Sequence, residues 1–172
     1  MLEKLTTKQE ARIPLQRAEY IARGRTTAPL PDNAELMRLF TAVYKAGGLT
    51  GPKEVRAVNS PLELYEAGRA ITAEPLQVGY GSFDSSWIGF YQFFRKFCGI
   101  KTPKDLDPLD DLVGKVGPYL AFSDLVIVSA NMSEIHVIDV GLHRIGGPAV
   151  SYPDGGRLTV YSLWGVRFSG DM

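Results

Sequence analysis

The chain has 172 residues, of which 45% are hydrophobic and 22% charged, the composition of an ordinary globular protein. Nineteen basic residues balance nineteen acidic ones, so there is no basic excess to indicate general nucleic-acid binding. Because the sequence has one cysteine, Cys98, and no apolar run of about 18 residues, it excludes an intramolecular disulfide, a four-cysteine zinc site and a membrane-spanning helix.

The first predicted helix follows a charged N-terminus. Thr7 and Glu10 have the spacing of a capping box, and Gly24 is a plausible end. Pro14 falls inside this stretch and its ring is incompatible with a helix interior. The helix therefore either kinks at Pro14 or begins at Ile13.

Two further helices flank a short strand. The first has Asp32 as its N-cap, apolar residues at three- and four-residue spacing, and Gly47 as a stop. Residues 54–58 predict a strand. Ser60 and Pro61 then provide an N-cap and a first-turn proline, which predicts another helix after a polar turn.

An aromatic helix is predicted over 87–97, with Asp84 or Ser85 as its cap. Aromatic side chains recur along it at helical spacing, so we expect it to be the most buried helix, although such a stripe can also form a partner surface. The acidic stretch 105–111 opens a shorter amphipathic segment that ends near Gly117.

From Leu125 the pattern changes to alternating strands. The predicted strands are 125–129, 134–140, 149–152 and 158–163. We expect an α+β fold in a single domain, 1–172, with N-terminal helices (about 5–118) packed with a C-terminal antiparallel sheet and β-hairpin module (about 122–170). Residues 1–11 lack the apolar core of a signal peptide, so a cytoplasmic location is predicted.

The terminal hairpin has turn chemistry of its own. Pro153, Asp154 and Gly155 suit a three-residue loop in which the glycine takes the left-handed conformation. Gly165 predicts a bulge or a second turn after the following strand. These turn residues explain much of the polar composition of the segment without invoking chemistry.

An ordered series of motifs also runs through the chain. It comprises Gln9-Glu10-Ala11, Ala46-Gly47-Gly48-Leu49, Ser60-Pro61-Leu62, Gly81-Ser82-Phe83-Asp84, His143-Arg144 with Gly147-Pro148-Ala149, Asp154-Gly155, and Trp164-Gly165-Val166-Arg167. The series resembles an uncharacterised bacterial domain family, common in actinobacteria and planctomycetes, whose terminal hairpins have relatives in phage and viral proteins. The resemblance implies a bacterial or phage origin and brings no catalytic residue with it.

Five polar residues near this hairpin are candidate binding residues: His143, Arg144, Asp154, Tyr161 and Arg167. A His143–Asp154 pair could orient an imidazole as a general base. Alternatively, Asp154 accepts hydrogen bonds from the backbone of its own turn, the explanation that we favour. No catalytic residue can be assigned.

No metal or cofactor site is predicted. Glu134 and His136 would share a strand face while Asp139 lies on the other, and two ligands are too few for zinc. The acidic stretch 105–111 lacks the spacing of a calcium loop. The glycines near Gly79 are not followed by a lysine at phosphate-loop spacing.

The pattern favours a non-enzymatic protein-interaction or accessory domain that binds a protein partner through its helical face or the rim of the sheet. A second hypothesis is a small-ligand binder or enzyme with a cleft between the helices and the C-terminal hairpin, which requires the five polar side chains to converge on one pocket. A third is a subunit of a larger assembly, which predicts a covered sheet edge. The sequence leaves the oligomeric state open.

Overall fold

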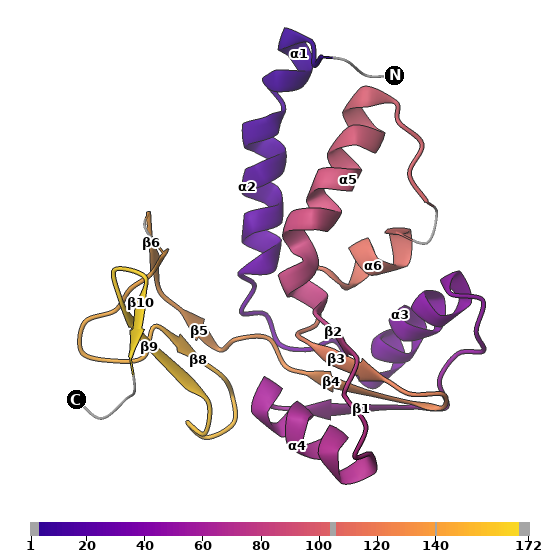
Figure 1. The fold of residues 1–172 in the computed structure, drawn as a ribbon, viewed down its shortest axis with the longest axis vertical. Coiled ribbons are helices and arrows are strands. Elements are labelled where there is room, and N and C mark those ends of the chain that lie inside the picture. The colour runs from indigo at the N-terminus through magenta and orange to yellow at the C-terminus, as the bar shows by residue number, and fades with distance from the viewer. Residues whose placement is uncertain (1–3, 104–105, 140, 169–172) are drawn as a thin grey trace.

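A computed structural model describes residues 4–103, 106–139 and 141–168 of the chain. Helices dominate the N-terminal part and most strands follow, so the α+β prediction is confirmed (Figure 1). Asp105 and Val140, which bound predicted elements, and residues 169–170 of the predicted β part lie outside the described residues. No helix of the described part is long and apolar enough to cross a membrane.

Capping chemistry sets the helix boundaries. The helices are α1 (Thr7–Glu10), α2 (Ile13–Gly24), α3 (Asn33–Ala46), α4 (Pro61–Ile71), the 3-10 helix η1 (Gly81–Asp84), α5 (Ser85–Cys98) and α6 (Leu106–Leu112). Asp32 and Ser60 accept hydrogen bonds from the backbone N–H groups three residues on, as predicted. The first cap is Thr6 rather than Thr7, because Thr6 forms the capping box with Gln9. The chain then breaks before Pro14, and α2 begins at Ile13.

The first sheet has the strand order β1-β4-β3-β2. Its strands are β1 (Glu54–Val58), β2 (Val78–Gly79), β3 (Tyr119–Ala121) and β4 (Leu125–Ser129). The predicted strand at 54–58 is present, but it pairs in parallel with β4, whereas the β2–β3 and β3–β4 pairs are antiparallel. The sheet is therefore mixed rather than wholly antiparallel.

The central strand β4 holds the core together. Val126 and Val128 point from one face of the sheet into a cluster with Leu39 and Phe40 of α3, and α6 also packs there. Ile127 points from the other face toward Leu64 of α4. Because both faces are covered, β4 is apolar from Leu125 to Val128 instead of alternating, as expected for a strand between two helical layers.

The second part of the β structure lies beside this core. Its strands are β5 (Glu134–Ile135), β6 (Val137–Ile138), β7 (Gly141–Leu142), β8 (Val150–Ser151), β9 (Thr159–Leu163) and β10 (Val166–Phe168). The sheet order is β10-β9-β8-β5, and β6 pairs with β7. The single strand predicted from Glu134 is wrong, because β5 and β6 separate at His136 and take different partners.

Of the two turns predicted in the terminal hairpin, the first differs from the prediction and the second agrees with it. Ser151 of β8 pairs with Thr159 of β9, so the loop is longer than the predicted three residues, although Gly155 has the expected positive φ of 73°. The second turn predicted at Gly165 is confirmed between β9 and β10. Trp164 and Gly165 both have positive φ, 54° and 80°, the conformation of a type I′ turn.

Helices α2 and α5 form an antiparallel pair, here called the arm, that extends from the core (Figure 1). Gln9 Nε2 donates to the Phe97 carbonyl at one end, and Gln16 Nε2 donates to the Gly89 carbonyl in the middle. The aromatic helix has more buried residues than any other described α-helix, as expected, but part of its aromatic stripe is open: Ile88 and Phe93 are buried, whereas Phe90 is 58% exposed. The helix packs on α2, α6 and η1.

Candidate functional site

Asp154 is engaged within the turn that contains it. Its carboxylate accepts hydrogen bonds from the backbone N–H groups of Gly156, at 3.2 Å, and Leu158, at 2.9 Å. The side chain is buried although its loop is largely exposed. Asp154 therefore fixes the loop, which agrees with the structural explanation offered from the sequence.

His143 and Arg144 are held by different partners. The Nδ1 atom of His143 accepts the backbone N–H of Trp164 at 3.0 Å, and the two rings lie 4.6 Å apart. Arg144 donates to Glu134 at 2.7 Å, and Glu134 also bonds His136 at 2.7 Å. These hydrogen bonds, from His136 first and then from Arg144, lower the pKa of Glu134. Each of the two predicted residues thus has a local structural role.

The five candidate residues do not line a common cavity. Tyr161 lies opposite Phe168 across the β9–β10 pair. Arg167, in contrast, lines a large cleft, and the described lining of that cleft contains none of the other four. Glu134 and His136 meet as strand alternation suggested, but within the described residues no group of three potential ligands is suited to a metal ion.

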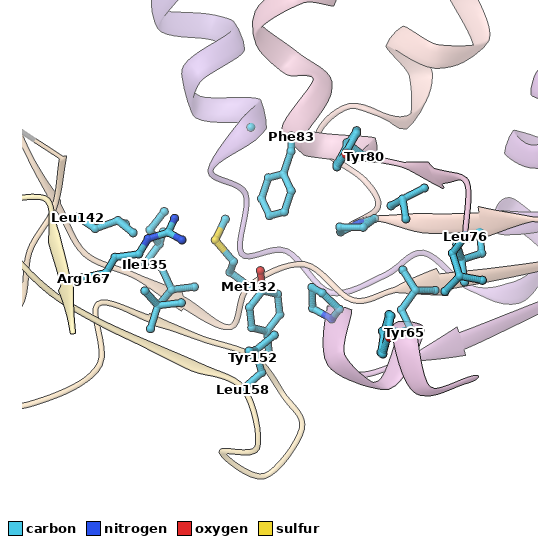
Figure 2. A pocket seen from close by; sticks show the side chains of 18 of the residues that line it. Tyr65, Leu76, Tyr80, Phe83, Met132, Ile135, Leu142, Tyr152, Leu158 and Arg167 are labelled. Atoms are coloured by element: carbon cyan, nitrogen blue, oxygen red, sulfur yellow. The ribbon is translucent and has the colours of Figure 1, made fainter. Parts of the chain in front are cut away.

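The cleft lies between the helical core and the second sheet and has a volume of about 890 Å³. Figure 2 shows Phe83, Met132, Tyr152 and Arg167 around this space. Of its twenty described lining residues, two are arginines and none is acidic, while most of the others have apolar side chains. Concave apolar sites with a few polar groups are typical of ligand binding.

Tyr152 is the main polar residue of the cleft that sequence reasoning missed. Burial, followed by the nearby carboxylate of Asp154, raises its pKa to about 12. The phenol is therefore protonated at neutral pH and able to donate a hydrogen bond. The strand predicted over 149–152 was a usable signal for a common direction of Val150 and Tyr152, although β8 itself ends at Ser151.

The arm carries a second hollow. A groove of about 530 Å³ runs between α2 and α5 and is lined by residues of both helices, among them Ile13, Tyr20, Phe90 and Phe93. Arg17 is the only charged residue of the described lining. On the opposite side of the arm, Tyr20 and Ile88 pack against Val113, which follows α6. The groove is therefore the side of the arm that no described element covers.

No family model, curated protein or solved structure matches the chain. The resemblance to an uncharacterised bacterial family stays a prediction. A function must therefore be argued from the cleft, the groove and the charges around them.

Proposed function

We propose that this protein is a non-enzymatic interaction domain whose arm groove binds an acidic amphipathic helix of a partner protein. The observation that carries the proposal is the apolar groove between α2 and α5, set in a strongly basic part of the chain. An enzyme has less support, because His143, Arg144 and Asp154 are each occupied by local contacts and lie outside a shared cavity.

The shape of the groove favours a helix as the occupant. Two antiparallel helices leave a furrow along their line of contact, and a further helix packs into such a furrow with its apolar stripe inward. At the middle of this furrow Gly89 lets α5 approach Tyr20 closely. Phe90 stands beside it and offers an aromatic side chain of the kind that anchors interfaces.

The charge of the arm favours an acidic occupant. Helices α2 and α5 contain four basic residues and one acidic residue, and with the residues that flank them (7–25 and 85–101) the count is eight basic and two acidic, a net charge of +6, whereas the whole chain is neutral. Two of these cations are paired with α6: Arg23 with Asp110 and Arg95 with Asp107. The remaining excess would attract glutamates flanking the apolar stripe of a partner helix and repel lysines.

The test uses two fluorescein-labelled peptides of about 18 residues, roughly 27 Å long as helices. Both carry leucines at three- and four-residue spacing, with glutamate at the polar positions of one and lysine at those of the other. By fluorescence anisotropy, we expect the acidic peptide to bind the full chain at least about tenfold more tightly than the lysine peptide does. This affinity should fall as ionic strength rises.

Matched variants locate the site. Phe90→Gln, inside the groove, should lower the affinity for the acidic peptide by about tenfold or more, whereas Leu15→Gln should leave this affinity unchanged. Leu15 is a fair control because it lies on α2, is 64% exposed and is not among the groove residues. Equal binding of the two peptides, or equal effects of the two variants, would reject the proposal.

Other occupants are distinguishable in the same way. The protein helix would be rejected as the occupant by any of three results. These are Phe90-dependent self-association in sedimentation, binding to phosphatidylserine vesicles that is tighter than binding to the acidic peptide, and binding to a single-stranded oligonucleotide that is tighter than binding to that peptide. The cytoplasmic location and the bacterial or phage origin remain predictions from the sequence.

A further inference from the structure

The cleft of Figure 2 lies apart from the arm groove, and its wall on the side of the second sheet is one continuous face. Ile135 lies opposite Val150, and Val150 lies opposite Val160, so the three form a row across β5, β8 and β9. Residues paired in this way share a sheet face. All three line the cleft.

Arg167 continues this face onto β10. It pairs with Ser162, which is two residues beyond Val160 and therefore points to the same side of the sheet. Val166, on the opposite face, is exposed. The alternation of the strand thus brings a guanidinium to the end of an apolar row (Figure 2).

The electrostatics of the cleft are one-sided. Its two cations, Arg69 and Arg167, face no carboxylate within the described lining. Arg69 is occupied by the backbone carbonyls of Ala73 and Glu74, at 3.0 and 3.1 Å. Arg167 is an exposed residue, and its guanidinium has no ion pair or hydrogen bond within the described residues, so its five donors are available in this part of the structure.

The opposite wall supplies the rest of an apolar site. Leu76, Val78 and Phe83 come from the segment around β2 and η1, and Met132 lies in the connection between the two sheets. The cavity volume falls within the range of about 300–1,000 Å³ that is usual for small-molecule sites. A ligand that covers an apolar surface of this size removes it from water, which favours binding.

We propose that this cleft binds a small amphiphilic anion, whose carboxylate or similar acidic group pairs with Arg167 while its apolar body lies against the row of Ile135, Val150 and Val160. Tyr152 directly follows β8 and lines the cleft (Figure 2), and its protonated hydroxyl supplies a donor there. Arginine suits this role because its planar fork pairs with both oxygens of a carboxylate.

The test compares decanoate with 1-decanol, which share a chain and differ in the charged group. Binding to the full chain is measured by displacement of 1-anilinonaphthalene-8-sulfonate fluorescence. We expect decanoate to bind at least about tenfold more tightly than decanol. Arg167→Met keeps an apolar stem and should abolish the preference for decanoate. Arg167→Glu reverses the charge, so this variant should instead prefer the cationic analogue decylammonium.

Two controls separate this site from other surfaces. Arg157→Met removes an arginine whose ion pair with Glu66 lies outside the cleft lining, and it should leave the preference intact. Phe90→Gln, in the arm groove, should also leave it intact, so failure of the acidic-helix proposal does not affect this one. Equal binding of decanoate and decanol by the wild type, or an unchanged preference in Arg167→Met, would overturn the assignment, as would no binding of either at about 1 mM.

Discussion

At the scale of single residues, the polar side chains near the C-terminus mainly hold turns. Asp154 bonds two backbone donors of its own loop, and His143 accepts the N–H of Trp164 at the next turn. Trp164 is a bulky residue at positive φ, a conformation that such residues rarely take. The adjacent His143 ring, tilted by 46° against the indole, and this hydrogen bond help to hold Trp164 there.

Asp154→Ala should lower the free energy of unfolding by about 1–3 kcal/mol, because the Gly156 and Leu158 N–H groups would lose their acceptor. Asp154→Asn keeps one acceptor oxygen and should cost less. Urea unfolding followed by circular dichroism measures both. The exposed Asp139 provides the control, since Asp139→Ala should be near neutral, and an Asp154→Ala protein as stable as the wild type would contradict this role.

At the scale of elements, local signals predicted the helices better than the sheets. Asp32 and Ser60 cap their helices as expected because a cap depends on residues three positions apart. The parallel pairing of β1 with β4 joins segments about 70 residues apart, and nothing within either strand specifies it. A cleft between the helices and the C-terminal hairpin was among the hypotheses, but its lining was not predicted apart from Arg167. The reason is the same, since the residue types around Arg167 do not reveal which residues will form the opposite wall.

Which aromatic side chains of α5 are buried could not be predicted from its periodicity either. Trp87, Phe90 and Tyr91 fit the pattern of a core stripe, yet only the faces toward α2 and α6 are covered. Hydrophobic spacing reports that a surface will pack, and it does not say whether the partner belongs to the same chain.

Gly89 tests how closely the two helices of the arm must approach. A Cβ atom there would lie 2.5 Å from the Tyr20 ring, so Gly89→Ala should lower the free energy of unfolding by about 1–3 kcal/mol. This outcome opposes helix propensity, which favours alanine by about 1 kcal/mol. Gly47→Ala is the control, because its nearest contact is an ordinary 3.5 Å. A stabilised Gly89→Ala protein, measured by urea unfolding, would mean that the helices lie farther apart.

At the scale of the whole molecule, the helical core and the second sheet are joined by more than one connection. The chain passes between them through Ala130, Asn131 and Met132, all of which are buried. Arg157 of the hairpin loop reaches back to Glu66 of α4 at 2.7 Å. The prediction of a single domain requires these links to make both parts unfold together.

The chain carries one tryptophan in each part, Trp87 in the arm and Trp164 in the terminal hairpin. Trp87→Phe and Trp164→Phe therefore give proteins whose fluorescence reports on one part at a time. A change at Glu35 perturbs only the helical part, because Glu35 lies in the first turn of α3. Hydrogen bonds from Arg38, and then Lys115, hold its pKa at about 2, well below the usual value of 4.5.

A carboxylate with a lowered pKa in the folded state stabilises the protein above its unfolded pKa and loses this contribution as pH falls. We therefore expect Glu35→Gln to be less stable than the wild type at pH 7, and the difference to shrink from about pH 4.5 toward pH 2. Glu74→Gln is the control, because Glu74 has no ion pair among the described side chains. If the chain is one domain, urea unfolding should show the same pH-dependent change at Trp164 as at Trp87. A change seen only at Trp87 would mean that the second sheet unfolds on its own.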